Sequence, residues 1–443
     1  MLPVFACVSA PPAYPLVEGF WIRNYKVFRQ IAIGSSFQQS VAMDFAEGMV
    51  LPYELTPLTL FAGDTGTGKS TIFDAFAFLA DCINHGIDRA FVRRGGFESV
   101  YHFNGVGPIS IGIAYRPCAE PRSLIYMLNI GCDARSLRPF VETELIVYRT
   151  RQADTQPRPV LFFQNGDKYN RLIQPWVGAQ DTVLEKIKQI DSSHLGLSAL
   201  AEFEDLPDIP LFKRYLDKFF VACYTSGNAV SLSPPKFKFM PAGNLAIDLG
   251  RVKNKHPVEF TTIMDVIASR MPGIDKIYLE TTESGRILLS FKVKGHNSLI
   301  YPAQLGEGHL RLLSLLTLFE DPIPVPLLGI EEPAAFMGHS QIASFAESLK
   351  YHVRELGGTQ YLVTTGDNAL IDQMDPTEVW FLSRDNNGSI YTARGIDELQ
   401  FLGIDLDSVG PYWYSEYIYR DRMQTQIPTA FSESAILKPS PKM

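Results

Sequence analysis

The sequence predicts an α/β protein built around a mainly parallel sheet. An apolar strand at residues 58–62 runs into a glycine-rich loop, and apolar residues at helical spacing follow over residues 71–83. Further along the chain, strand 325–330, helix 341–356 and strand 361–365 alternate. Strands that alternate with helices are typical of a parallel sheet covered by helices.

Size and composition fit a globular protein with a large core. The chain has 443 residues, of which 46% are hydrophobic and 20% are charged. This length predicts roughly two or three units of about 150 residues each. The formal net charge is −8. An acidic chain does not attract nucleic acid over its whole surface, so a DNA or RNA contact would need a local basic patch.

The cysteines and the apolar segments bear on the compartment. The five cysteines are scattered without CxxC spacing, which disfavours a zinc site or redox dithiol and suggests a reducing compartment. No apolar stretch is long enough for a membrane span. The first twenty residues carry no Lys or Arg and match a signal peptide poorly. We therefore expect a cytoplasmic protein without a membrane partner.

The glycine-rich loop matches the phosphate-binding pattern G-x-x-x-x-G-K-[ST]. It comprises Gly63, Asp64, Thr65, Gly66, Thr67, Gly68, Lys69 and Ser70, and Thr71 follows. Glycines let backbone N–H groups wrap around phosphates, and the following helix directs its positive end at the same charge. Lys69 is predicted to reach the β and γ phosphates of ATP, and the Ser70 hydroxyl to ligate Mg²⁺. A chance glycine-rich turn is the disfavoured alternative, because the strand and the helix are both in place.

An acidic pair follows the apolar strand at residues 325–330. Glu331 is predicted to hold the metal and Glu332 to activate the attacking water. The alternative is a solvated strand end with two surface glutamates. That alternative weakens because the ends of central parallel strands are where ligands bind.

A second glycine loop, Gly306–Glu307–Gly308, precedes an almost wholly apolar helix at residues 312–319. A glycine loop at a helix start favours anion binding, and an ordinary tight turn is the alternative. The later buried strand, residues 361–365, ends at Gly366 and Asp367.

The middle of the chain is rich in strands. Strand-like runs occur at residues 20–33, 109–115, 145–148 and 160–163, and a short helical piece is predicted at 181–190. Sustained heptads and internal repeats are absent from the sequence, which excludes a long coiled coil.

Two sets of polar residues remain open to alternatives. The basic run is better explained as a solvated face than as a nucleic-acid contact. It consists of Lys236, Lys238, Arg251, Lys253 and Lys255. The scattered histidines are better explained as structural residues than as a nuclease site. They are His85, His102, His194 and His256.

Together, the segments GDTGTGKST, QLGEGHLRLL, LLGIEEP and YLVTTGD resemble the SMC/RecF-type branch of the ABC ATPases. More narrowly, they are similar to the small predicted ATPases related to the OLD family and to antiphage-defence ATPases. The resemblance covers roughly residues 18–420 and implies an ABC-type P-loop head interrupted by a β-rich and helical insertion or lid. The implied division is an irregular leader at 1–19, an N-terminal half at 20–115, the insertion at 116–297, a C-terminal half at 298–420 and a loosely ordered tail at 421–443.

The resemblance also implies a homodimer with ATP and Mg²⁺ at its interface. Each ATP would be bound by one chain's P-loop and capped by the other chain's Gly306–Gly308 loop. Such a clamp would serve DNA repair or antiphage defence with a separate nuclease or toxin as effector. The alternative is a nucleotide-gated scaffold that sequesters a toxin or effector with little or no hydrolysis. A small-molecule kinase is disfavoured because the second glycine loop would have no role in it.

The sequence departs from the family pattern in the second glycine loop, after the acidic pair and after the later buried strand. Gly366 replaces a switch histidine, Gly306 replaces a serine, and Ala334 and Ala335 replace Glu-Asn. Because a glycine cannot supply an imidazole, we expect secure ATP binding and slow hydrolysis. Asp367 is a rival catalytic carboxylate that could partly replace the histidine. A TOPRIM-type nuclease domain does not fit after the last ATPase strand, so any nuclease would be a separate chain.

Overall fold

The computed structural model describes most of the chain. Described are residues 14–34, 54–117, 122–150, 158–164, 170–173, 183–186, 195–202, 206–223, 237–239, 245–283, 287–385 and 388–402. The tail expected at 421–443 lies outside these residues, as does most of the expected leader. Strand β1 (Leu16–Tyr25) begins inside the expected leader, so the last residues of that leader are strand residues and are buried.

The first sheet is seven-stranded, in the order β11-β10-β15-β16-β3-β17-β18, and only its β17–β18 pair is antiparallel. Its strands are β3 (Leu58–Gly63), β10 (Phe220–Cys223), β11 (Phe237–Phe239), β15 (Leu327–Glu331), β16 (Gln360–Thr365), β17 (Val379–Arg384) and β18 (Ile390–Arg394). The predicted α/β fold with a mainly parallel sheet is therefore confirmed.

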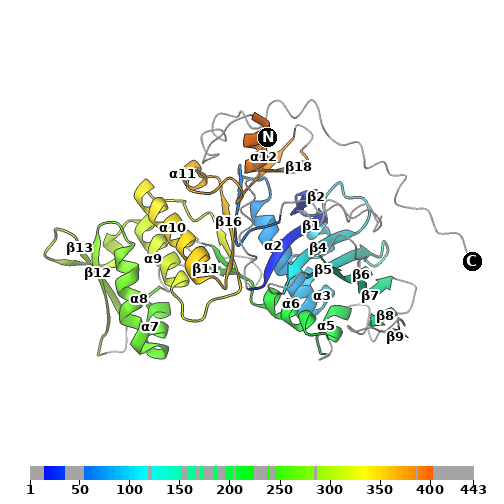
Figure 1. Cartoon of the computed structure of the whole chain (residues 1–443), viewed down its shortest axis with the longest axis horizontal. Helices are drawn as coiled ribbons and strands as arrows, with labels where there is room; N and C mark the ends of the chain where they lie inside the picture. The colour runs from blue at the N-terminus through cyan, green and yellow to red at the C-terminus, as the bar shows by residue number, and fades with distance from the viewer. Residues whose placement is uncertain are drawn as a thin grey trace, which may run out of the picture.

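Helices cover both faces of this sheet (Figure 1). Phe61 packs into the core that contains α2 (Lys69–His85), whereas Leu60 and Ala62 face the core that contains α9 (Glu307–Phe319) and α10 (His339–Tyr351). This alternation is what a strand buried on both faces requires. The remaining helical elements near this sheet are η3 (His352–Leu356), α11 (Asn368–Ile371) and α12 (Gly395–Leu402).

A second sheet is eight-stranded and antiparallel throughout, in the order β2-β1-β4-β5-β6-β7-β8-β9. Besides β1, it contains β2 (Phe28–Ile33), β4 (Ile109–Arg116), β5 (Arg122–Cys132), β6 (Pro139–Thr150), β7 (Arg158–Gln164), β8 (Asn170–Ile173) and β9 (Val183–Lys186). The helix predicted at 181–190 is wrong over β9, because pairing with β8 overrides the helical propensity of this short segment. Strand β4 ends at the predicted boundary between the N-terminal half and the insertion, and it pairs with β5 on the other side of that boundary. The division at residue 116 stays a prediction.

The third sheet is small and lies beside α9 and α10 (Figure 1). It consists of β12 (Ile274–Thr281), β13 (Ile287–Val293) and β14 (Leu299–Ile300), and α7 (Leu245–Lys255) and α8 (Pro257–Ser269) pack on it. Ile267 and Phe291 belong to the same core as α9, so this unit packs against one face of the parallel sheet.

Five shorter helical elements complete the described part of the chain. They are α3 (Ile87–Val92), α4 (Phe97–Val100), α5 (Gly196–Leu200), α6 (Asp208–Asp217) and η2 (Pro302–Gln304). Across the described residues, no helix is long and apolar enough to cross a membrane.

Candidate nucleotide-binding site

The glycine-rich loop joins the end of β3 to the start of α2. Gly66 and Gly68 have φ angles of 87° and 96°, in the left-handed region that favours glycine. A Cβ atom at Gly68 would lie 2.5 Å from the ring of Phe28 on β2. The loop conformation and its close packing on β2 therefore both require glycine at position 68.

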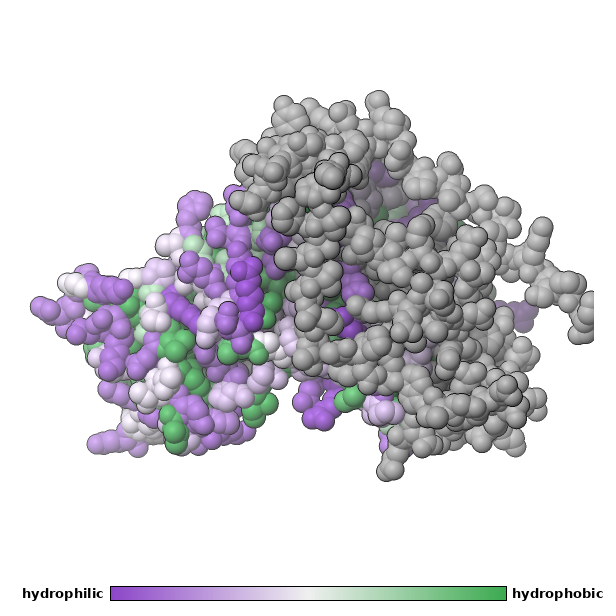
Figure 2. All heavy atoms as spheres, viewed as in Figure 1, coloured by the Kyte–Doolittle hydropathy of each residue, from purple (hydrophilic) through white to green (hydrophobic). Residues whose placement is uncertain are grey.

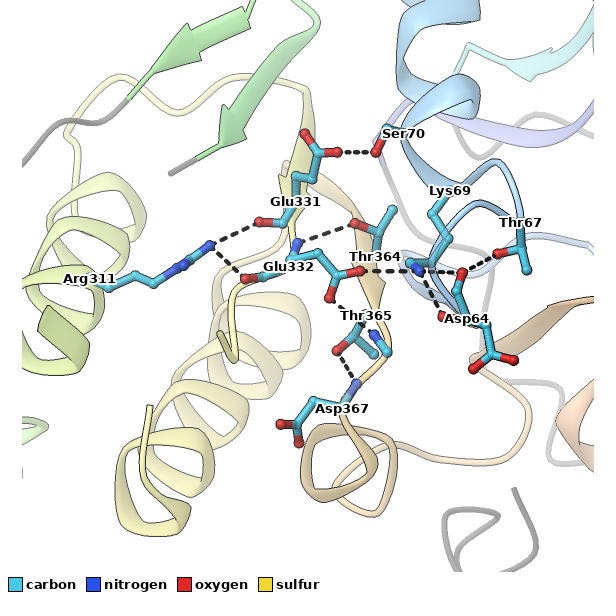
Figure 3. Close-up of polar contacts among 12 residues, drawn as sticks. Asp64, Thr67, Lys69, Ser70, Arg311, Glu331, Glu332, Thr364, Thr365 and Asp367 are labelled. Atoms are coloured by element: carbon cyan, nitrogen blue, oxygen red, sulfur yellow. Dashed lines mark hydrogen bonds and ion pairs between the residues drawn. The ribbon is translucent and has the colours of Figure 1, made fainter. Parts of the chain in front are cut away.

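Lys69 is the buried cation of the loop, with 8% of its side chain exposed. Its Nζ donates to the carbonyl oxygens of Gly63 at 2.6 Å and Asp64 at 3.0 Å. It also lies 3.2 Å from Glu332 Oε1 (Figure 3). The structure therefore joins the predicted phosphate-binding lysine to the predicted base, although the two lie far apart in the sequence.

Ser70 and Glu331 meet beside the loop. The Ser70 hydroxyl donates to Glu331 Oε1 (Figure 3). Strand order explains the contact, because β15, β16 and β3 are neighbours and their carboxyl ends share one edge. Across the described residues, no group of three or more His, Cys, Asp or Glu side chains could hold a metal alone. A hydroxyl and one carboxylate do suit Mg²⁺, which takes its other ligands from phosphates and water.

Glu332 is held in an uncommon backbone conformation, with φ of 43°. Its N–H donates to the carbonyl oxygen of Thr364 at 3.0 Å, and the Thr364 hydroxyl lies 3.2 Å away. Its Oε2 accepts from the N–H of Gly366 at 3.0 Å. A left-handed glutamate persists only where its surroundings fix it, and such residues cluster at functional sites. Strand β16 therefore fixes both the backbone and the carboxylate of Glu332.

Arg311 on α9 is a site residue that sequence reasoning missed. Its side chain is buried, and Nη2 donates to the carbonyl oxygen of Glu332 at 2.6 Å while Nη1 donates to that of Ala335 at 3.2 Å. A lone arginine in an otherwise apolar helix was the available signal, because a buried guanidinium needs acceptors. Arg311 ties the helix of the second glycine loop to the acidic strand end (Figure 3).

Arg384 and Asp367 are two further polar residues close to the ends of strands in the parallel sheet. Arg384 closes β17, and its Nη2 donates to the carbonyl oxygen of Gly66 at 2.6 Å, a contact that the sequence did not reveal. Asp367 Oδ1 accepts from the N–H groups of Ala369 at 2.9 Å and Leu370 at 3.3 Å. Asp367 therefore caps α11, and a catalytic role for its carboxylate stays a prediction.

The second glycine loop begins α9 away from this cluster. Gly306 is exposed and Glu307 half-buried, whereas a Cβ at Gly308 would lie 2.4 Å from the carbonyl oxygen of Phe336 in the same chain. In the described part of the chain, no hydrogen bond or ion pair joins residues 306–308 to the P-loop. The structure thus brings together the P-loop, the acidic pair and Gly366, but not the second glycine loop.

The family model described as "AAA domain, putative AbiEii toxin, Type IV TA system" matches residues 58–372, well over half of the chain. The chain belongs to this family. The match spans the P-loop, the second glycine loop, the acidic pair and Asp367, and confirms the predicted class of P-loop ATPase. No curated protein matches the sequence.

Solved structures of SMC heads are similar over most of the chain. The SMC head domain from Thermotoga maritima is 14% identical, with a TM-score of 0.43 over 85% of this chain and 98% of that one. The Smc head from Pyrococcus furiosus bound to the C-terminal domain of ScpA is 12% identical, with a TM-score of 0.44 over 88% of this chain and 99% of that one. The fold assignment itself rests on the sheet order and the family match.

In this member of the family, buried ion pairs anchor the P-loop helix. Asp74 on α2 contacts Lys26 Nζ at 2.5 Å, Arg94 Nε at 3.0 Å and the Tyr25 hydroxyl at 2.7 Å. Arg94 also contacts Asp81 at 2.8 Å. Burial raises the pKa of Asp74, but Arg94 and Lys26 outweigh it and hold that pKa below its usual range. The network fastens α2 to the β1–β2 turn and to the segment after α3.

The remaining polar predictions concern the basic run and the histidines. Arg251 pairs with Asp321 at 3.2 Å, and Lys253 Nζ donates to the carbonyl oxygen of Leu279 at 3.0 Å, so both cations have contacts within the chain. His102 is buried and contacts the carbonyl oxygen of Lys26 at 2.7 Å, as a structural histidine does. Lys236 and His194 lie outside the described residues.

Proposed function

We propose that this chain is a Mg²⁺-dependent ATPase that acts as a nucleotide-gated dimeric clamp. One observation carries the proposal: Lys69 and Ser70 of the P-loop contact Glu332 and Glu331 of the neighbouring acidic strand end. A phosphate-binding cation, a metal-binding hydroxyl and two carboxylates at one sheet edge are the parts that ATP hydrolysis requires.

ATP binding is assigned to the loop itself. The backbone N–H groups of residues 63–70 would surround the β phosphate, and the Lys69 ammonium would contact the β and γ phosphates. Ser70 and Glu331 would hold Mg²⁺, which supplies electrostatic stabilisation of the phosphate charge. The hydrogen bond between Ser70 and Glu331 supports this assignment, because two oxygens that meet can bind one cation.

Glu332 is assigned to the chemical step. Its carboxylate would accept a proton from water as the water oxygen bonds to the γ phosphorus and the bond to the ADP oxygen breaks. The Gly366 N–H and the Lys69 ammonium orient this carboxylate. Gly366 supplies a backbone donor but no imidazole, so the proposal includes slow turnover.

The second glycine loop is assigned to a partner chain. Gly306 and Glu307 begin a helix of 13 residues and make no polar contact with the P-loop of their own chain among the described residues. Such a helix start favours an anion, and the γ phosphate held by a second copy is the anion that a head-to-head dimer would supply. Arg311 lies one helical turn after Glu307 and donates to the carbonyl oxygen of Glu332. A shift of α9 on dimer closure would therefore move the backbone of Glu332.

The proposed biological role names a class of process and a class of effector protein. We propose that the clamp works in DNA repair or antiphage defence with a separate nuclease or toxin as effector. A second candidate is a nucleotide-gated scaffold that sequesters a toxin-like partner with little or no hydrolysis. The family description, which names a type IV toxin–antitoxin system, and the glycine at position 366 favour this candidate.

Turnover and mass, measured together, test the proposal. The clamp predicts slow phosphate release with Mg²⁺-ATP, faster release with double-stranded DNA, and an ATP-dependent rise from monomer to dimer in light scattering. ATP binding without phosphate release, with or without DNA, would favour the scaffold. A purified chain that binds no ATP would contradict both candidates.

A further inference from the structure

A cavity of about 320 Å³ lies at the end of the parallel sheet remote from the P-loop. Phe220, Leu328 and Tyr361 line it, and each stands at or next to the amino end of its strand, β10, β15 or β16. Glu331 and Thr365 lie at the carboxyl ends of the last two strands, beside the P-loop. The cavity is therefore separate from the candidate nucleotide site but built on the same strands.

The inner wall of the cavity is apolar and aromatic. Phe319 from the end of α9 and Val252 from α7 join the three strand residues, and Leu328, Tyr361, Phe319 and Val252 are all buried. Phe319 and Tyr361 meet edge to face, with ring centroids 5.7 Å apart. Ile323, 67% exposed, also lines the cavity and extends this apolar surface outward. Rings and aliphatic groups of this kind bind the apolar body of a ligand.

Two residues of the lining are cationic. Arg251 and Lys255 on α7 line the cavity, and their spacing of four residues places both on one face of the helix. Lys253 faces elsewhere, because its Nζ donates to the carbonyl oxygen of Leu279. Among the described lining residues, Asp321 is the one carboxylate, and it pairs with Arg251 at 3.2 Å. The formal charges of Arg251, Lys255 and Asp321 therefore sum to a net positive charge.

We propose that this cavity binds a small organic anion with an aromatic or aliphatic body. The rings of the inner wall would hold the body, and Lys255, whose side chain is exposed at the cavity, would contact the anionic group. The volume of the cavity falls within the range of ligand pockets, which is about 300–1,000 Å³.

The ligand would be coupled to the nucleotide site through α9 and β15. Phe319 lines the cavity at one end of α9, and Arg311 contacts Glu332 eight residues earlier, which is about 12 Å along a helix (319 − 311 = 8). Strand β15 runs from the cavity at Leu328 to Glu331. Coupling between two ligands is reciprocal, so each would change the affinity of the other by the same factor. This coupling, unlike the binding itself, rests on the proposed function.

Fluorescence titration with 8-anilinonaphthalene-1-sulfonate, an aromatic sulfonate, tests the binding on the full chain. We expect saturable binding of one probe per chain, and saturating Mg²⁺-ATP should not compete directly for the site. Lys255→Glu should weaken this binding about tenfold or more, because it replaces a charge-assisted contact by repulsion. Lys294→Glu is the matched control, since Lys294 is exposed and does not line the cavity. The neutral probe N-phenyl-1-naphthylamine should bind more weakly than the sulfonate.

Equal probe affinities for the two charge-reversal variants, strictly competitive displacement of the probe by Mg²⁺-ATP, or absence of saturable binding would overturn the proposal. The coupling has its own readout, which is the affinity of ATP with and without saturating probe. If probe binding depends on Lys255 while ATP affinity is unaffected by the probe, the site stands and the coupling is refuted. If the chain binds the probe but no ATP, the proposed function fails and the anion site stands.

Discussion

Lys69 Nζ lies 3.2 Å from Glu332 Oε1, which makes a direct contact between the P-loop and the acidic strand end. The contact depends on β16, which lies between β3 and β15. Thr364 of this strand holds the backbone of Glu332, and Gly366 directly after the strand holds its carboxylate. The lysine assigned to bind phosphate and the glutamate assigned to activate water are therefore positioned by β3 and β15, the two strands on either side of β16.

The first prediction concerns ATP affinity. Lys69→Ala removes a charge-assisted contact worth about 1.5–3 kcal/mol, so ATP binding should weaken about tenfold or more. Isothermal titration with ATP measures the effect, and Lys294→Ala, a change at an exposed lysine, serves as the control. Equal affinity in the wild type and Lys69→Ala would refute the assignment of the loop.

The second prediction concerns ATP-dependent association. A Cβ at Gly306 meets no atom nearer than His309 Nδ1 at 4.0 Å, so Gly306→Arg should fold normally, bind ATP within one chain and block closure with a partner. Gly308→Arg should instead lower the melting temperature, because its Cβ would lie 2.4 Å from the carbonyl oxygen of Phe336. Light scattering with Mg²⁺-ATP and cross-linking across the loop compare the variants. Normal ATP-dependent dimers of Gly306→Arg would exclude the capping role.

The third prediction concerns Arg311 as a positioning residue. Arg311→Met leaves the carbonyl oxygens of Glu332 and Ala335 without their charged donor, which should lower the free energy of unfolding by on the order of 3 kcal/mol. Turnover should fall more than ATP affinity, because the P-loop contacts remain. Arg89→Met changes an exposed arginine and provides the matched control. Wild-type stability and turnover in Arg311→Met would show that this contact has no such role.

The fourth prediction concerns pH and the ion pairs beneath α2. The folded-state pKa of Asp74 is lowered, so its carboxylate stabilises the fold above its unfolded pKa of about 4 and loses that contribution as the pH falls through the folded pKa. Asp74→Asn removes one of the two carboxylates that pair with the buried Arg94 guanidinium. The free energy of unfolding should fall by about 3–5 kcal/mol at neutral pH.

Denaturant unfolding between neutral pH and pH 3 checks the pH dependence. Stability should fall less steeply in Asp74→Asn than in the wild type, because the variant has no carboxylate to protonate at this position. Asp275→Asn is the control, since Asp275 and its partner Lys292 are both about half exposed and such surface pairs contribute little. Parallel pH profiles for the wild type and Asp74→Asn would contradict the assignment.

Local signals explain what the sequence could predict. The strand, loop and helix around Lys69 are adjacent in the chain, so their pattern alone identifies them. The meeting of Ser70 with Glu331 follows from a general rule, because the carboxyl ends of neighbouring parallel strands share an edge. These predictions needed no knowledge of distant packing.

Other features depend on distant partners. The sequence shows Arg311 directly before an apolar helix but does not show that its side chain donates to Glu332 and Ala335. The sequence of β9 predicts a helix, but the segment pairs with β8 as a strand. The sequence of β10 also does not reveal that this strand pairs with β15 in the parallel sheet. The left-handed backbone of Glu332 is also fixed from outside, by β16.

The most direct test of the account is Glu332→Gln, compared with Asp367→Ala. The glutamine keeps the shape of the side chain and an acceptor for the Gly366 N–H but cannot take a proton, and a general base contributes about 10²–10⁴ in rate. Phosphate release and light scattering are measured together in Mg²⁺-ATP. We predict that Glu332→Gln abolishes the slow release and accumulates as an ATP-bound dimer, whereas Asp367→Ala slows release less. Phosphate release by Glu332→Gln at the wild-type rate would contradict the central claim that Glu332 activates the attacking water.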